Sequence, residues 1–155
     1  MRDEDYMRLA LVEAETAMTR GDIPVGAVVV RNGLVIGQAG NEKEITGDPT
    51  AHAEMLAIRR AVENTGAWRL TDATLYVTLE PCPMCAGAMI QARLGRLVFG
   101  TPDSKAGAAG SVVDILDVPW LNHQVPVKSG VLQKECAEIL SNFFQQMRST
   151  NAEKE

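Results

Sequence analysis

The stretch ATLYVTLEPCPMCAGAMIQARLGRLVF, residues 73–99, decides the fold that we expect for this chain. β-Branched and apolar residues over 73–79 favour a strand. Pro81 and Pro83 suit a turn and the first turn of a helix, which continues to about Gly95. Residues 97–99 then resume a strand. Strand, helix and strand in close succession predict a sheet that is covered by helices.

The rest of the chain continues this alternation. Apolar residues at three- and four-residue spacing predict helices at 3–20, 51–64 and 132–147, with Thr50 as the N-cap of the second. Apolar runs predict strands at 24–30, 34–37 and 125–131, and Asn32-Gly33 is a strong hairpin signal between the first two. Polar loops are expected at 41–50 and 100–111, and a frayed tail at 148–155. The chain is therefore predicted to form a single α/β domain over residues 1–155.

The composition is that of an ordinary globular protein. Of the 155 residues, 46% are hydrophobic and 23% are charged, which suits one domain with a sizeable core. No apolar run is long enough to span a bilayer, and the charged start MRDEDYMRLA lacks the apolar segment of a signal peptide. We therefore expect a cytoplasmic protein with no membrane partner. The net charge of −5 argues against non-specific binding of nucleic acid over the whole surface.

Two short motifs carry groups that can bind a metal ion. His52 opens the triplet His-Ala-Glu, and Cys82 and Cys85 belong to the run Pro-Cys-Pro-Met-Cys at 81–85. Zinc accepts imidazole nitrogen and thiolate sulfur in a tetrahedron, and catalytic zinc sites typically use three protein ligands and leave one position for water. The three residues therefore predict a catalytic Zn²⁺ site. A closed structural site would need a fourth ligand, for which Cys136 and His123 are the candidates.

Glu54 lies two residues beyond this histidine, in the first turn of the helix predicted at 51–64. Zinc lowers the pKa of a bound water toward ~7, so a nearby carboxylate can take its proton and pass it to a substrate. A glutamate at a helix start is also common because it interacts favourably with the helix macrodipole. Its combination with the three metal ligands favours the catalytic interpretation, in which Glu54 carries protons.

The pattern H-x-E followed by P-C-x-x-C is the known signature of zinc nucleobase deaminases. Around it, PVGAVVV, DPTAHAEMLAIR, DATLYVTLEPCPMCAGAMI, LVFGTPDSKAGAAGS, LNHQV and ECAEILSNFF resemble the bacterial tRNA-specific adenosine deaminases, over about residues 6–148. The resemblance implies a three-layer α-β-α, cytidine-deaminase-like fold with a five-stranded mixed sheet, one Zn²⁺ per subunit and a homodimer. It implies hydrolysis of adenosine to inosine at the wobble position (34) of a tRNA anticodon. Zinc-bound hydroxide would attack C6, Glu54 would move the protons, and ammonia would leave.

The same resemblance implies contacts with an anticodon stem-loop. His52, Cys82 and Cys85 match the zinc ligands, Asn41 matches a base-contacting asparagine, and Asn122-His123 match a pair that lines the loop-binding surface. An adenine must be splayed out of its strand to reach the metal, which is cheapest in a single-stranded loop. We expect its pocket to be walled by Ile23, Pro24, Val25, Ala53 and Leu79. Val25 and Leu79 suit plain core packing equally well.

Residues further along the chain are expected to bind RNA around the target base. Asp103 can accept a hydrogen bond from a ribose 2′-OH and so favour RNA over DNA, or it can simply be a turn aspartate after a proline. Lys105 is expected to contact a phosphate, and Phe144 either stacks on a base or packs the last helix. Relatives often carry basic residues after the Phe pair, whereas this chain has Gln145-Gln146-Met147-Arg148. Only Arg148 offers a cation there.

Two other functions share these motifs. A deaminase of free guanine, cytosine or a nucleoside would use the same zinc chemistry, and only the substrate would differ. A non-catalytic zinc-binding protein would be expected to lack the proton-carrying glutamate, whereas Glu54 is present.

Overall fold

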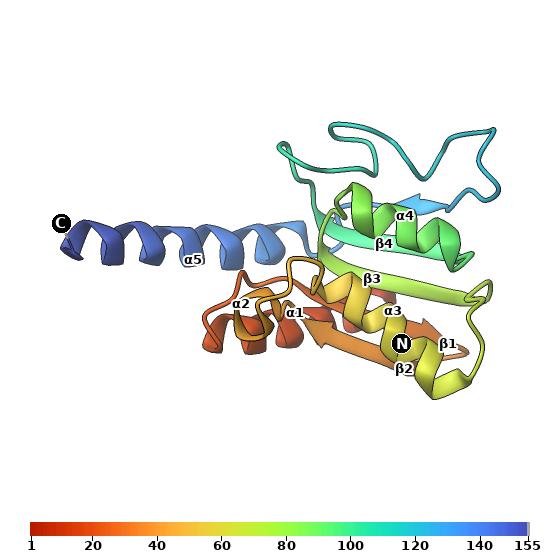
Figure 1. Ribbon diagram of the computed structural model, residues 1–155, viewed down its shortest axis with the longest axis horizontal. Helices are drawn as coiled ribbons and strands as arrows, with labels where there is room; N and C mark the ends of the chain where they lie inside the picture. The colour runs from red at the N-terminus through yellow and green to blue at the C-terminus, as the bar shows by residue number, and fades with distance from the viewer. Residues whose placement is uncertain (155) are drawn as a thin grey trace.

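The computed structural model describes residues 1–154, and side chains through residue 151. Helices and strands are interspersed along the chain (Figure 1). In chain order they are α1 (Asp3–Thr19), β1 (Gly26–Arg31), β2 (Leu34–Gly40), α2 (Lys43–Thr46), α3 (Ala53–Thr65), β3 (Ala73–Leu79), α4 (Pro83–Gln91), β4 (Arg96–Thr101), β5 (Val127–Lys128) and α5 (Gln133–Lys154).

The five strands form one mixed sheet in the order β2-β1-β3-β4-β5. Strand β1 pairs antiparallel with both β2 and β3, whereas β3, β4 and β5 run parallel to one another. Asn32 and Gly33 connect β1 to β2 with φ values of 52° and 75°. Both residues are in the left-handed region that a two-residue type I′ hairpin turn requires. The hairpin and the five-stranded mixed sheet are confirmed.

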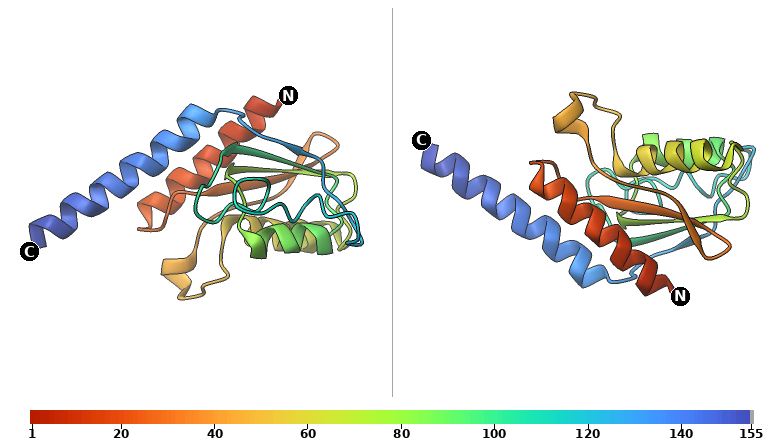
Figure 2. Two further views of the ribbon diagram at one scale, coloured as in Figure 1. Left: turned by 90° about the horizontal axis from the view of Figure 1, so that it is seen from above. Right: turned by 90° about the horizontal axis from the view of Figure 1, so that it is seen from below.

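Helices cover both faces of the sheet, with α1 and α5 on one side and α3 and α4 on the other (Figure 2). Alternating side chains of each strand supply the two cores. Val28, Tyr76 and Val98 pack on the side of α1 and α5, whereas Val29 and Leu75 pack on the side of α3 and α4. The predicted three-layer α-β-α fold is therefore confirmed.

Several details differ from the sequence-based expectation. Helix α4 ends at Gln91, before the predicted end near Gly95, and β2 continues to Gly40, beyond the predicted end at residue 37. His52, not Thr50, is the N-cap of α3, because His52 has extended backbone angles and its carbonyl accepts the N–H of Leu56. The polar loop at 41–50 contains the short helix α2. Strand β5 spans two residues of the seven predicted at 125–131. Helix α5 continues to Lys154 instead of fraying from residue 148, and Figure 1 shows it extending well beyond the sheet.

Within the described residues 1–154, no helix combines the length and the apolar character that crossing a bilayer requires.

Candidate active site

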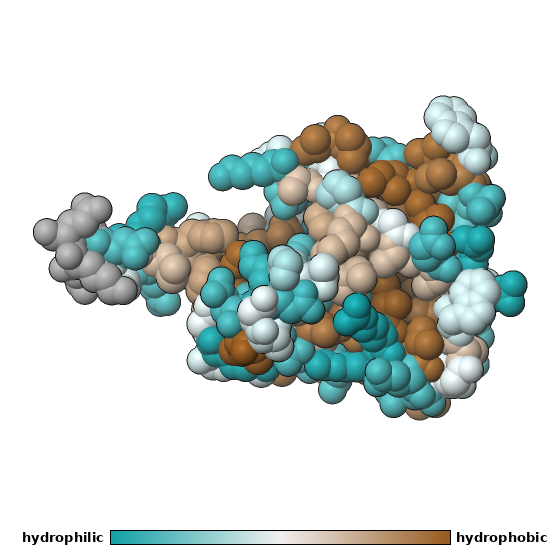
Figure 3. All heavy atoms as spheres, in the orientation of Figure 1, coloured by the Kyte–Doolittle hydropathy of each residue, from teal (hydrophilic) through white to brown (hydrophobic). Residues whose placement is uncertain are grey.

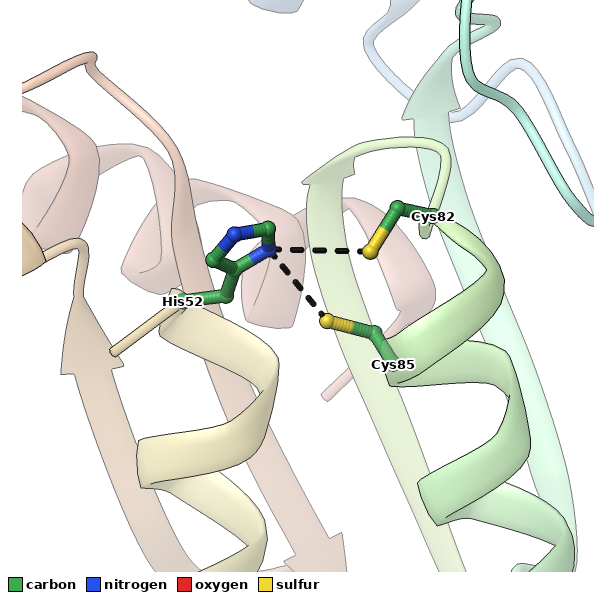
Figure 4. A group of neighbouring side chains, drawn as sticks. All are labelled: His52, Cys82 and Cys85. Atoms are coloured by element: carbon green, nitrogen blue, oxygen red, sulfur yellow. Dashed lines mark hydrogen bonds between the residues drawn. The ribbon is translucent and has the colours of Figure 1, made fainter. Parts of the chain in front are cut away.

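The two sequence motifs meet because two helices begin side by side at one end of the sheet. His52 is the N-cap of α3, and Cys82 is the N-cap of α4. Pro83 at the first position of α4 has no backbone N–H to leave unpaired and is preset for a helical φ, so the helix starts directly after Cys82. Cys85 follows in the first turn. Figure 4 shows the imidazole ring pointing from α3 toward both thiols on α4.

His52, Cys82 and Cys85 form a triangle whose dimensions fit a zinc ion. Nδ1 of His52 is 3.7 Å from Sγ of Cys82 and 3.5 Å from Sγ of Cys85. Tetrahedral zinc with ordinary Zn–N and Zn–S bonds separates a nitrogen and a sulfur ligand by about 3.6 Å. One candidate ligand atom from each residue lies within 4.8 Å of the others. The donor set and the spacing therefore fit Zn²⁺.

The electrostatics of the triangle prepare one sulfur for metal binding. A hydrogen bond from the Cys85 thiol, together with the adjacent His52, lowers the pKa of Cys82 to about 4, although burial opposes the shift. The pKa of Cys85 is raised, first by its hydrogen bond to Cys82 and then by burial. The hydrogen bond to Cys82 also raises the pKa of His52. The lowered pKa favours the thiolate form of Cys82, and a cation in the triangle would favour the same form for Cys85.

Glu54 lies in the first turn of α3 and lines the same cavity as His52 and Cys82. Its side chain is only 4% exposed, and its carboxylate lies beside the thiol of Cys85. Burial disfavours the charged form and raises the pKa of Glu54 to about 7, while its own backbone N–H and His52 pull in the opposite direction. A carboxyl group with a pKa near neutrality can both accept and release a proton, which is the property that acid–base catalysis needs.

Asn41 links the loop after β2 to the helix that carries Glu54. Its Oδ1 accepts the backbone N–H of Ala53 at 2.8 Å, so it satisfies one of the free donors at the start of α3. Because the backbone N–H of Ala53 can only donate, this bond assigns the oxygen and the nitrogen of the Asn41 side-chain amide. The Nδ2 group of Asn41 is therefore left as a hydrogen-bond donor for a ligand.

A cavity of about 160 Å³ opens in front of this group of residues. Five of the predicted substrate-binding residues line it, together with three residues that were not predicted. The predicted ones are Ile23, Val25, Asn41, Leu79 and Asp103. The lining is completed by His52, Glu54 and Cys82, and by the unpredicted Lys43, Glu80 and Ala106.

A second hollow of about 370 Å³ adjoins the first and shares Ile23, Leu79 and Asp103 with it. Lys105 and Phe144 line this second hollow. Phe144 is 42% exposed, whereas its neighbour Phe143 is buried against the domain. Lys105 and Phe144 thus lie next to the catalytic cavity but do not line it.

Other predicted residues do not line the cavity. Pro24 and Ala53 are buried. The backbone N–H of Ala53, not its side chain, takes part in the site by donating to Asn41. Asn122 is exposed in the segment before β5, and Nε2 of His123 lies 2.7 Å from the carbonyl oxygen of Leu94. Arg148 is exposed on α5. The expected RNA contacts of these residues stay predictions. Neither His123 nor Cys136 belongs to the metal-binding group found among the described residues.

The three unpredicted residues had different signals in the sequence. Lys43 belongs to helix α2, which the sequence indicated only as a polar loop. Ala106 lies in a Gly- and Ala-rich loop that carries no pattern. Glu80 directly precedes the cysteine motif, so its position was visible, but the partners that fix its role lie more than twenty residues further on.

Comparison with known proteins places this geometry in a family. The family model described as MafB19-like deaminase matches residues 1–148. A tRNA-specific adenosine deaminase of Bacillus subtilis is 49% identical over 147 residues, covering 95% of this chain and 91% of that protein. One from Haemophilus influenzae is 50% identical over 147 residues, covering 94% and 85%.

Solved structures agree with these relatives. A structure from a study of A-to-I editing by tRNA:A34 deaminases at the wobble position of transfer RNA is 48% identical, with a TM-score of 0.85. The match covers 88% of this chain and 99% of that one. A guanine deaminase from Bacillus subtilis is 33% identical with a TM-score of 0.65, covering 96% and 95%. Both the sequence and the shape of the chain are thus more similar to the tRNA-editing structure than to that guanine deaminase.

Proposed function

The chain belongs to the family of tRNA-specific adenosine deaminases, and we propose that it hydrolyses adenosine to inosine at the wobble position of a tRNA anticodon. One observation carries the proposal. A buried glutamate, Glu54, lies beside a histidine and two cysteines with zinc spacing, and all but Cys85 of this group line one cavity. Hydrolytic deamination needs this combination of a Lewis acid, a proton carrier and a pocket for the base.

His52, Cys82 and Cys85 would hold the zinc ion. Zinc at this position would supply a Lewis acid that lowers the pKa of water from about 15.7 toward 7. Glu54 takes the proton that this water loses, because its own pKa lies close to 7. The same carboxyl group then delivers the proton to N1 of adenine and assists the departure of the amino group as ammonia. Water and adenosine thus become inosine and ammonia.

Asn41 orients the base in this scheme. Its Oδ1 is occupied by the N–H of Ala53, so its Nδ2 group faces the ligand as a donor. A purine ring nitrogen is a suitable acceptor. Ile23, Val25 and Leu79 add apolar wall to the same cavity, which suits the faces of a flat base. These contacts favour a purine that has been turned out of a single-stranded loop.

We propose further that the protein acts as a homodimer in the cytoplasm, where its tRNA substrate is processed. The segment between β4 and β5 exposes four large apolar side chains, Val112, Val113, Trp120 and Leu121. Figure 3 shows apolar side chains gathered in this region, over α4 and the segment that follows β4. An exposed apolar surface of this kind is typical of protein–protein contacts. Light scattering after gel filtration measures the mass, and a strictly monomeric protein would contradict the dimer.

Turnover measurements test the reaction. The zinc-loaded protein is given an anticodon stem-loop with adenosine at the wobble position, and separately free guanine, cytosine and cytidine. We expect inosine in the stem-loop and no release of ammonia from the small substrates. A stem-loop with the adenosine moved by one position is the matched control. Exclusive turnover of a free base would contradict the tRNA assignment and favour the guanine deaminase-like function of the 33% identical structure.

A further inference from the structure

Glu80 is a buried carboxylate that the proposed reaction does not use. It follows the last residue of β3 and precedes the cysteine motif, and only 2% of its side chain is exposed. A buried carboxylate is costly unless hydrogen bonds compensate for the lost water. Its partners therefore show what it does.

All the hydrogen bonds of the Glu80 carboxylate go to one loop, residues 102–111. Oε1 accepts the backbone N–H of Asp103 at 3.0 Å and the hydroxyl of Ser111. Oε2 accepts the backbone N–H of Ala109 at 2.9 Å and that of Ser111 at 3.1 Å. Each oxygen thus accepts two donors, which fills the usual acceptor capacity of a carboxylate. No free lone pair remains for a proton transfer or for a metal ion.

The loop wraps closely around this carboxylate. A Cβ atom added to Gly107 would come within 2.5 Å of both Cδ and Oε1 of Glu80. The backbone N–H of Ala108 donates to the carbonyl of Pro81 at 2.8 Å, directly next to Glu80 in the chain. The loop contains no regular helix or strand, so these contacts, together with its own backbone hydrogen bonds such as that from Gly107 to Asp103, fix its path.

The held loop contributes directly to the catalytic cavity. Asp103 and Ala106 line the cavity, and Oδ1 of Asp103 accepts the N–H groups of Lys105 and Ala106 in a tight turn. The position of the turn is therefore set from Glu80 through the N–H of Asp103. We propose that Glu80 is a positioning residue, whose carboxylate holds loop 102–111 so that Asp103 and Ala106 form one wall of the substrate pocket.

Glu80→Gln tests the proposal with little change in volume. An amide puts an NH₂ group where one of the two oxygens was, so at least one backbone N–H of the loop loses its acceptor. We expect the amides of Asp103, Ala109 and Ser111 to exchange hydrogen at least about tenfold faster. The N–H of Glu80 itself donates to Thr101 and serves as the internal control, with unchanged exchange.

The kinetic part of the test rests on the proposed function. KM for the anticodon stem-loop should rise about tenfold in Glu80→Gln, kcat should change less than about threefold, and the zinc content should equal that of the wild type. Ser111→Ala is the matched mild variant, because it removes the hydroxyl and keeps all three backbone donors. We expect changes of less than about threefold from it in both exchange and KM.

Two results would overturn the proposal. One is unchanged amide exchange in loop 102–111 of Glu80→Gln, and the other is faster exchange with an unchanged KM. If Glu80→Gln does not fold, Gly107→Ala replaces it, because the new Cβ would lie 2.5 Å from the carboxylate of Glu80 and 2.5 Å from the backbone carbonyl of Asp103, and so must disturb the contact between them. Wild-type exchange and KM in that variant would equally overturn the proposal. A wild-type protein that leaves the stem-loop unchanged would instead refute the proposed function, and the exchange measurement would still decide whether Glu80 holds the loop.

Discussion

Two buried glutamates flank the metal-binding triangle, and their surroundings give them opposite properties. Glu54 comes two residues after His52, and Glu80 comes two residues before Cys82. Their exposed fractions are 4% and 2%, so solvent exposure alone does not distinguish them, although Glu54 lies deeper in the protein than Glu80. They differ also in the supply of hydrogen-bond donors, because Glu80 receives four from loop 102–111, whereas Glu54 receives only its own backbone N–H and the thiol of Cys85.

The pKa values follow from this difference. Burial raises the pKa of Glu54 to about 7. Burial also acts to raise the pKa of Glu80, but hydrogen bonds from Ser111, Asp103 and Ala109 together outweigh it and lower that pKa. Environments that separate the pKa values of two neighbouring carboxyl groups are a common way to divide catalytic tasks. Here one glutamate can exchange a proton near neutral pH, and the other stays an anion.

Replacing each glutamate by glutamine should give the largest difference in activity between the two positions. Glu54→Gln keeps the size of the side chain but cannot accept or release a proton. We expect kcat on the stem-loop to fall by about a thousandfold or more, because general acid–base catalysis contributes roughly 10²–10⁴-fold and Glu54 acts more than once. Zinc content, measured by mass spectrometry, should stay at one per chain, as expected also for Glu80→Gln. Full activity of Glu54→Gln would remove the basis for assigning the proton transfer to this residue.

The same two substitutions should shift stability in opposite directions in chelated protein. The pKa of Glu54 is about 7 in the folded chain against 4.5 ordinarily. A raised pKa means that folding gains stability below pH 4.5 and loses it as the pH rises through 7. Glu54→Gln removes this loss and should stabilise the protein at pH 8 by up to about 3 kcal/mol relative to wild type.

Glu80 has the reverse sign, because its pKa is lowered in the folded chain. Its stabilising effect is present above the ordinary pKa and disappears as the pH falls. Glu80→Gln should therefore be destabilising at pH 8 and less so at pH 4. Thermal unfolding of both variants in chelator at pH 4, 6 and 8 measures the two trends. Parallel trends would show that hydrogen-bond supply does not separate the two carboxylates.

The two glutamates also mark how far the sequence could predict this site. The spacing of His52, Glu54, Cys82 and Cys85 already indicated the group that could hold a metal ion and the glutamate proposed to carry protons, because all four lie within short motifs. Alternating apolar residues indicated both cores of the sheet, and Asn32-Gly33 indicated the hairpin. These features depend on neighbours in the chain, which a sequence displays.

Features that depend on distant partners were missed or misplaced. The N-cap of α3 was assigned to Thr50, whereas Asn41 satisfies the N–H of Ala53 from another loop. Helix α2 was missed because an acceptor outside it, the buried carboxylate of Asp22, binds the N–H of Glu44. The role of Glu80 was invisible for the same reason, since its donors all lie in loop 102–111. Tertiary hydrogen bonds, not local propensity, decide these positions.

Variants of Asn41 test the helix start that carries Glu54. Asn41→Ala removes both the acceptor for Ala53 and the donor for the base. We expect a loss of about 1–3 kcal/mol in unfolding free energy from the unpaired buried N–H, together with a rise of about tenfold or more in KM. Asn41→Asp is the comparison variant, because it keeps an acceptor for Ala53 but replaces the donor by a second oxygen and adds a negative charge. Its unfolding temperature should stay closer to wild type while its KM rises. Equal destabilisation by both variants would contradict the role of Oδ1 at the helix start.

Variants of Asp103 test the loop that Glu80 holds, and we expect them to have the smallest effect on activity. Its Oδ1 is used by the N–H groups of Lys105 and Ala106, so Oδ2 is the oxygen left to accept a ribose 2′-OH. Asp103→Asn keeps the turn and replaces that acceptor by an NH₂ donor. We expect the ratio of kcat/KM for an RNA stem-loop to that for the same loop with 2′-deoxyadenosine at the target to fall about tenfold or less, because a hydroxyl can also accept a hydrogen bond. Asp103→Ala breaks the turn as well and should raise KM for both substrates. An unchanged ratio in Asp103→Asn would leave Asp103 as a turn residue alone, and loop 102–111 would then shape the pocket without reading the sugar.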